Sequence, residues 1–217
     1  MKNKTILIVI SSAFLMGIVF FAGMNIYKNN EVKKYEFAAK DNFKLFVPEH
    51  SIRKGSADAK IFVTEFFDPE CETCRRFHEV NLHFLKEYDG KIQYVMRYAP
   101  FHGNSIMMIK ILEASRKQNK YWEVLEALYA HQPEWGNHHN PQPDLVWKFL
   151  PDTGVNIAQL KVEMESPQIQ KIIEKDLLDG KQLQISGTPT FYVNGIPPEA
   201  FGPEYLKAAI DKALVEL

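Results

Sequence analysis

The feature that most constrains the fold of this chain is a pair of cysteines three residues apart, Cys71 and Cys74, close behind a strongly apolar segment. They are the only 2 cysteines among 217 residues. Two cysteines cannot build a disulfide scaffold for a chain of this length, and a structural zinc site would need two further ligands from elsewhere. The pair therefore points to redox chemistry.

The segment before the cysteines predicts a buried strand, and the segment after them predicts a helix. Residues 60–67, KIFVTEFF, are rich in β-branched and aromatic side chains, which is typical of a strand buried on both faces. From Cys71 onward, apolar residues recur at spacings of three and four. Cys71 then lies at a helix start, where unpaired N–H groups and the helix dipole stabilise a thiolate. We expect Cys71 to be the accessible nucleophile and Cys74, one turn later on the same side, to be the resolving thiol.

The remaining pattern predicts an α/β core with a helical insertion. Residues 91–98 form a second predicted strand, and the next ninety or so residues have mainly helical spacing. Strand character returns at 190–193, followed by Asn194-Gly195, a strong hairpin signal. A last helix is predicted from Pro203. We expect the insertion to occupy about 100–185.

Two further residues stand out beside the cysteines. Glu65 lies within the buried strand, where a charged carboxylate is unfavourable unless it has a role. The alternative is an edge strand with Glu65 in water. Pro189 follows Thr188 at the start of the penultimate strand, a position that suits a residue without an N–H group and where the bond could be cis. The alternative is an ordinary trans proline ending a loop.

Together these residues resemble the bacterial Dsb-type (DsbA/DsbG-like) branch of the thioredoxin superfamily. The resemblance rests on DPECETC after the strand, Glu65 six residues before the first cysteine, GTPT before a strand and the helical insertion, over roughly 45–217. It implies a thioredoxin-like fold in which Cys71 forms the mixed disulfide and Cys74 resolves it. It implies that Glu65 helps to move the Cys74 proton. It also implies that Thr188 and Pro189 form a cis-proline loop facing the active site, where backbone groups pair with a substrate peptide.

The chain departs from this family in two places. Glu72 and Thr73 stand between the cysteines, instead of the Pro-His of strongly oxidising members. A carboxylate beside a thiolate raises the thiol pKa, and a threonine hydroxyl is a weaker donor than a charged imidazole, so we expect a less oxidising pair. Residues 28–59 are too short for the dimerisation domain of the isomerase members, which argues against an isomerase.

The N-terminal part of the sequence differs from the rest. Residues 6–27, ILIVISSAFLMGIVFFAGMNIY, carry no charge and are long enough to cross a bilayer as a helix. Lysines precede the run, as in a signal sequence, but no convincing cleavage site follows. We expect 1–27 to be an uncleaved signal anchor, with a cleaved signal peptide as the alternative, 28–44 to be a tether, and 45–217 to be the thioredoxin-like domain.

The expected function is thiol–disulfide exchange on cysteine-containing proteins outside the cytoplasm, in the periplasm or on the outer face of the membrane, with dithiol oxidation favoured. It needs no cofactor beyond the Cys71–Cys74 disulfide, and a membrane redox partner would recycle the pair. Disulfide reduction is one alternative, and a metal-handling or redox-inert binding module is another. The scattered histidines, among them His78 and His102, suggest no metal site, and a formal net charge of −1 gives no reason to expect nucleic acid.

Overall fold

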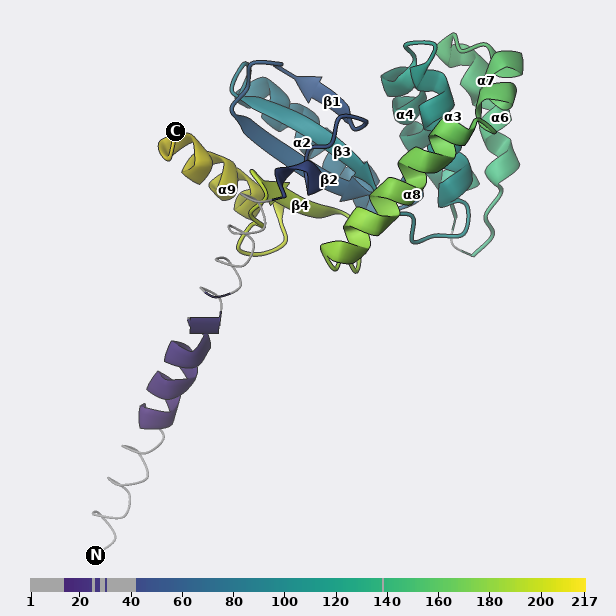
Figure 1. Ribbon diagram of the computed structural model, residues 1–217. Coiled ribbons are helices and arrows are strands. Elements are labelled where there is room, and N and C mark those ends of the chain that lie inside the picture. Colours follow the sequence, from purple (N-terminus) through teal and green to yellow (C-terminus); the bar gives the residue numbers. More distant parts are fainter. Residues whose placement is uncertain (1–13, 25, 28–29, 31–41, 138) are drawn as a thin grey trace, which may run out of the picture.

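A four-stranded mixed sheet forms the centre of the domain. The computed structural model describes residues 14–24, 26–27, 30, 42–137 and 139–217 (Figure 1). The strand order is β1-β3-β2-β4. β2 and β3 are parallel, whereas β1 and β4 pair antiparallel with β3 and β2. The strands are β1 (Ile52–Gly55), β2 (Ile61–Phe67), β3 (Ile92–Tyr98) and β4 (Thr190–Val193).

Side chains of the two central strands point alternately to opposite faces of the sheet, so a separate hydrophobic cluster forms on each face. Ile61, Val63 and Phe67 of β2 belong to the larger cluster, whereas Phe66 belongs to the smaller one. Helices α2 (Glu72–Glu87) and α9 (Pro203–Val215) contact each other and the sheet. Glu65 shares the strand face of Val63 and Phe67, so its carboxyl group points toward the cluster that contains the cysteines.

The edge strand β1 was not predicted from the sequence. It is only four residues long, and its charged side chains lie half-buried, so it lacks the apolar alternation that marks a strand. Gly55 ends it at a φ of +103°, and a Cβ there would lie 2.7 Å from the carbonyl oxygen of Ile92. The close approach of β1 to β3 therefore requires glycine at this position.

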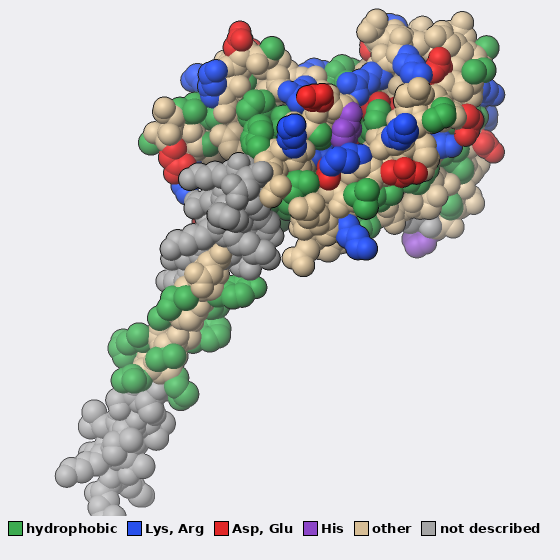
Figure 2. Space-filling model, viewed as in Figure 1, with side chains coloured by type: hydrophobic (Ala, Val, Ile, Leu, Met, Phe, Trp, Pro, Cys, Tyr) green, Lys and Arg blue, Asp and Glu red, His purple; other side chains and the backbone are tan. Residues whose placement is uncertain are grey.

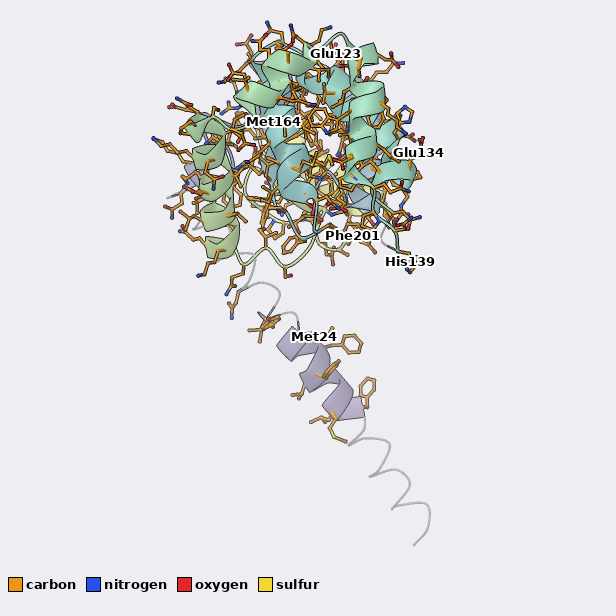
Figure 3. The ribbon with its side chains drawn as sticks, turned by 90° about the vertical axis from the view of Figure 1, so that its right-hand side faces the viewer. Met24, Glu123, Glu134, His139, Met164 and Phe201 are labelled. Atoms are coloured by element: carbon orange, nitrogen blue, oxygen red, sulfur yellow. The ribbon has the colours of Figure 1, made fainter. Side chains whose placement is uncertain are left out.

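The helical insertion lies between β3 and β4, and it faces the viewer in Figure 3, where Glu123 and Glu134 mark two of its helices. Short 3₁₀ turns connect several elements: η1 (Phe43–Leu45), η2 (Pro143–Leu145) and η3 (Leu150–Thr153). The insertion comprises α3 (Ser105–Arg116), α4 (Tyr121–Ala130), α5 (Gln132–Trp135), α6 (Val146–Phe149), α7 (Ile157–Glu163) and α8 (Pro167–Gln182).

A buried ion cluster fastens the insertion to the sheet. Arg97 of β3 is fully buried, and its Nη2 lies 2.7 Å from both Asp176 Oδ1 and Asp179 Oδ2 of α8. The backbone N–H of Tyr98 donates to the second oxygen of Asp176 at 2.7 Å. Each of these charged side chains has a partner of opposite charge, which offsets the cost of burying it.

The predicted hairpin after β4 is formed only as a turn. Asn194 and Gly195 adopt φ values of +48° and +83°, as expected for this dipeptide, but Val193 pairs with Ile196 through an isolated bridge. Pro197 and Pro198 follow directly and cannot donate to a ladder, so no second strand continues.

The expected transmembrane helix over 6–27 is not supported by the described part of the chain. Within it, residues 14–24 and 26–27 are helical. Their apolar side chains are largely exposed (Figure 2), for example 71% for Phe14. Among the described residues, no helix is both long and apolar enough to span a membrane. Residues 1–13 and most of the expected tether lie outside the described residues.

Candidate active site

Cys71 caps the N-terminus of α2. Its backbone is extended, with φ −74° and ψ 120°, and its sulfur accepts a hydrogen bond from the N–H of Cys74 at 3.4 Å. The N–H of Cys71 donates to the carbonyl oxygen of Asp68 at 3.0 Å, which closes a turn between β2 and the helix. The sulfur thus faces N–H groups that have no partner within the helix, which favours its thiolate form.

A second contact places Cys71 against the start of β4. Its Sγ lies 3.4 Å from the carbonyl oxygen of Thr188, and the Thr188–Pro189 peptide bond is cis. The cysteines and this distant loop are therefore brought together, as the sequence suggested. Because Phe66 of β2 pairs with Thr190 of β4, the strand end before the cysteines and the strand start after Pro189 share one edge of the sheet.

The two free thiols differ strongly in acidity. The pKa of Cys71 is lowered from 9.0 to about 5, chiefly by the hydrogen bond from the Cys74 thiol. Burial opposes this shift. A hydrogen bond from the Thr188 side chain and those from the backbone N–H groups of Cys74 and Thr73 support it. For Cys74, which is 1% exposed, burial raises the pKa far above its usual range, and its bond to Cys71 adds to the shift. The pair thus combines an acidic thiol with a buried one that retains its proton.

Glu65 lies beneath this pair and is 2% exposed, so the predicted burial is confirmed. Its Oε2 accepts a hydrogen bond from Nδ2 of Asn81 at 3.0 Å, and the same amide group contacts the hydroxyl of Tyr94 at 2.9 Å. Its Oε1 has no protein partner. Burial raises the pKa of Glu65 well above 4.5, and the negative charge of Cys71 raises it further. Burial therefore favours the neutral acid, and one of its oxygens has no hydrogen-bond partner.

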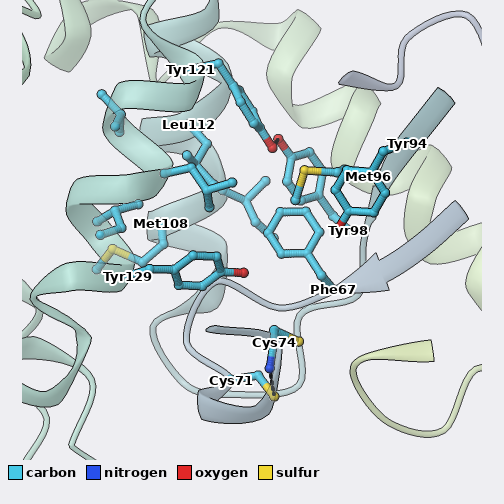
Figure 4. Packing of buried hydrophobic residues seen from close by; sticks show 14 of the residues in the cluster. Phe67, Cys71, Cys74, Tyr94, Met96, Tyr98, Met108, Leu112, Tyr121 and Tyr129 are labelled. Carbon is cyan, nitrogen blue, oxygen red and sulfur yellow. Dashed lines mark hydrogen bonds between the residues drawn. The ribbon is translucent and has the colours of Figure 1, made fainter. Parts of the chain in front are cut away.

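Aromatic side chains belong to the same buried hydrophobic cluster as the cysteines. Figure 4 shows Phe67, Tyr98 and Tyr129 on the same side of the pair. His78, one turn beyond Cys74, packs its ring on Tyr129 with centroids 5.2 Å apart, and neither ring nitrogen has a partner. Burial, followed by the positive charge of Lys54, lowers the pKa of His78 to about 4, so this histidine is neutral.

Two buried acids that the sequence did not single out hold the loop before Cys71. Asp68 accepts the N–H of Glu70 at 2.8 Å and that of Phe101 at 2.7 Å. The carboxylate of Glu70 accepts both the backbone N–H and the side-chain amide of Asn104, at 2.7 and 2.8 Å. The active-site turn is therefore tied to the loop that follows β3.

Gln132 of α5 holds the same turn from the helical insertion. Its Nε2 donates to the carbonyl oxygens of Pro69 and Cys71 at 2.9 and 3.1 Å, and its Oε1 accepts from Nε of Arg75 at 3.0 Å. No sequence pattern marks this contact, because 61 residues separate Gln132 from Cys71.

The residues between the cysteines contribute differently. Glu72 is exposed at the first turn of α2. The hydroxyl of Thr73 accepts a bond from Arg76 at 3.0 Å, whereas its backbone N–H stabilises the Cys71 thiolate. No cluster of three or more His, Cys, Asp or Glu side chains in the described chain has the arrangement of a metal site.

Comparison with known proteins agrees with this geometry. Residues 48–212 match the family model described as thioredoxin. The chain belongs to the thioredoxin family. A probable disulfide bond formation protein D from Bacillus anthracis is 29% identical over 99% of both chains. Its counterpart from Bacillus cereus is 32% identical, over 74% of this chain and 77% of that protein.

Other family members extend the comparison. A thioredoxin-like oxidoreductase from Silicibacter pomeroyi shares 25% identity, with a TM-score of 0.69, and covers 80% of this chain and 98% of its own. Some relatives are much longer: the chain spans 23% of the Na⁺/H⁺ antiporter NhaA of Herminiimonas arsenicoxydans, at 24% identity. The thioredoxin-like α/β fold predicted from the sequence is confirmed. The protein is a Dsb-type thiol–disulfide oxidoreductase of the thioredoxin superfamily, as its sequence indicated.

Proposed function

We propose that this protein oxidises pairs of thiols in other proteins to disulfides, with Cys71 as the nucleophile and Cys74 as the resolving cysteine. The observation that carries the proposal is the asymmetry of the pair. Cys71 has a pKa lowered to about 5, while Cys74 is buried with a raised pKa. Stabilising the Cys71 thiolate stabilises the reduced form of the pair. The disulfide is then more readily reduced, which makes it an oxidant.

The reaction proceeds by two exchanges. A substrate thiolate attacks Sγ of Cys71, the Cys71–Cys74 bond breaks, and Cys74 leaves with the electron pair and takes up a proton. The second substrate thiolate then attacks the substrate sulfur of the mixed disulfide, and Cys71 leaves as a thiolate. The substrate is oxidised by two electrons, and the cysteine pair is reduced by two. The low pKa of Cys71 makes it a good leaving group in this second step.

Glu65 supplies the proton in the first step. Its raised pKa favours the neutral carboxyl group, and its Oε1 has no hydrogen-bond partner. As Cys74 becomes a leaving thiolate in a buried place, the neutral acid donates its proton and later regains one from water. In the reverse direction, the carboxylate takes the proton from Cys74.

The substrate binds in extended form beside Thr188 and Pro189. The carbonyl oxygen of Thr188 lies 3.4 Å from Sγ of Cys71, so a peptide that pairs with this backbone brings its cysteine to the nucleophile. Backbone pairing is independent of sequence, which suits an enzyme that acts on many cysteine-containing proteins.

We also infer that the protein acts outside the cytoplasm, anchored through 6–27 and reoxidised by a membrane thiol oxidase. Stable protein disulfides form in oxidising compartments, and the uncharged run is of a length suited to a membrane. A fusion of residues 1–44 to a phosphatase that is active only when exported tests this inference. An active, membrane-sedimenting reporter supports it, and an inactive one contradicts it.

The deciding experiment is the reduction potential of the Cys71–Cys74 couple, with an oxidative refolding assay on a reduced two-cysteine substrate. We expect a potential more oxidising than the ~−270 mV of thioredoxin but more reducing than the ~−120 mV of the strongest family oxidant. The oxidised protein should restore substrate activity, and Cys71→Ser should not. A potential at or below ~−270 mV would instead favour disulfide reduction.

A further inference from the structure

The loop after β3 brings an imidazole to the cysteine turn. His102 lies in this loop, and its Nδ1 contacts Oδ2 of Asp68 at 2.8 Å. The backbone N–H of His102 approaches the same oxygen at 3.1 Å. One carboxylate oxygen therefore contacts both the ring and the backbone of His102, and the His102 side chain is only 26% exposed.

Asp68 connects this imidazole to the nucleophile. Its side chain is fully buried, and its carbonyl oxygen accepts the N–H of Cys71 at 3.0 Å. A carboxylate buried this close to Cys71 would by itself disfavour the thiolate, since like charges repel. A positive charge on His102 compensates the charge of Asp68 and so removes this repulsion.

We propose that His102, fixed by Asp68, is a positioning residue whose imidazolium stabilises the Cys71 thiolate and so sets how oxidising the pair is. The proposal deepens the function given above and rests on it. Neither residue between the cysteines is a cation, and His102 brings a positive charge from a different loop. No sequence pattern indicates this contact, because 34 residues separate His102 from Asp68.

The groups around His102 favour its charged form. Burial alone would lower the pKa of His102, but the hydrogen bond to Asp68 and the charges of Asp68, Cys71 and Glu70 raise it overall. Coupling between two titrating groups is reciprocal: if the thiolate favours the imidazolium, the imidazolium favours the thiolate to the same extent. When the disulfide forms, the thiolate charge disappears, and His102 binds its proton less tightly.

The first test uses the unmodified protein. The His102 ring is titrated by NMR in the reduced and in the oxidised state, with His83 as the control because it is 70% exposed and pairs with Glu87. We expect a higher pKa for His102 in the reduced state and no change for His83. Equal His102 values in the two states would overturn the proposal.

The second test separates charge from structure. His102→Asn retains a side-chain N–H that can reach Asp68 but removes the cation, and His83→Asn is the matched control. We expect His102→Asn to raise the Cys71 pKa, measured by thiolate absorbance, and to shift the equilibrium with glutathione toward a more reducing pair by about tenfold, which is about 30 mV. A folded His102→Asn variant with both values unchanged would refute the proposal. Neither titration needs a substrate, so a failure of the oxidation assay leaves these results unaffected.

Discussion

Sγ of Cys71 lies 3.4 Å from the carbonyl oxygen of Thr188, although 117 residues separate the two in sequence. The contact arises because β2 and β4 are antiparallel neighbours, so the end of one strand meets the start of the other. A site made of a thiol and a backbone carbonyl thus depends on strand pairing more than on any single side chain.

The asymmetry of the cysteines predicts which variant traps substrates. In Cys74→Ser, the Cys71 thiolate can still attack a client disulfide, but Cys74 can no longer resolve the resulting mixed disulfide, so covalent complexes with client proteins should accumulate on non-reducing gels. Cys71→Ser should form few, because Cys74 is 1% exposed and retains its proton. Equal trapping by the two variants would contradict the assignment of roles.

The buried acid predicts a change in rate. Replacing Glu65 with Gln keeps the contact with Asn81 but removes the exchangeable proton. Resolution of a mixed disulfide by Cys74 should slow by about tenfold or more across neutral pH, given the usual contribution of a positioned acid or base. Glu79→Gln, on the exposed side of α2, is the matched control. A rate equal to wild type would show that Glu65 takes no part in proton transfer.

The same substitution has a signed effect on stability. Because the folded pKa of Glu65 is raised, its stabilising contribution is complete below the unfolded pKa of ~4.3 and is lost as pH rises through the folded value. Glu65→Gln should therefore become more stable relative to wild type as pH rises above ~4.3. Urea unfolding of both proteins between pH 4 and 9 checks this, and a constant difference in unfolding free energy would contradict it.

The sequence predicted the site to the extent that it depends on local pattern. A strand dense in apolar residues, a helix start and a proline after threonine are encoded within a few residues of Cys71, Glu65 and Pro189. Contacts made across the fold leave no such pattern. Gln132 and His102 reach the cysteine turn from the insertion and from the β3–α3 loop, and each resembles an ordinary surface residue in the sequence. Tertiary structure alone reveals them.

The ion cluster between β3 and α8 predicts a large loss of stability. Arg97→Met leaves the carboxylates of Asp176 and Asp179 buried without this partner, which should destabilise the protein by about 3–5 kcal/mol. Lys212→Met, which breaks an exposed pair with Glu216, should lower the unfolding free energy by at most about 1 kcal/mol. Denaturant unfolding measures both. Similar values for the two variants would mean that the Arg97 cluster contributes no more than a surface pair.

The last prediction concerns the residues between the cysteines, where this chain departs from strongly oxidising relatives. The pKa of Cys71, about 5, lies above the ~3.5 of the strongest oxidant in the family. Glu72 occupies the first helical position, where proline is well tolerated, so Glu72→Pro should preserve α2 while removing a negative charge. Thr73→His should add a cation at the same helix start.

Together, these two substitutions should lower the Cys71 pKa toward ~3.5 and move the potential toward ~−120 mV, with tenfold in the exchange equilibrium for each 30 mV. Thiolate absorbance and equilibration with glutathione give the two quantities. Glu72→Gln, which removes the charge alone, is the control that divides the effect. If Glu72→Gln leaves the Cys71 pKa unchanged while Thr73→His lowers it, the carboxylate has no influence, and the missing imidazolium accounts for the difference.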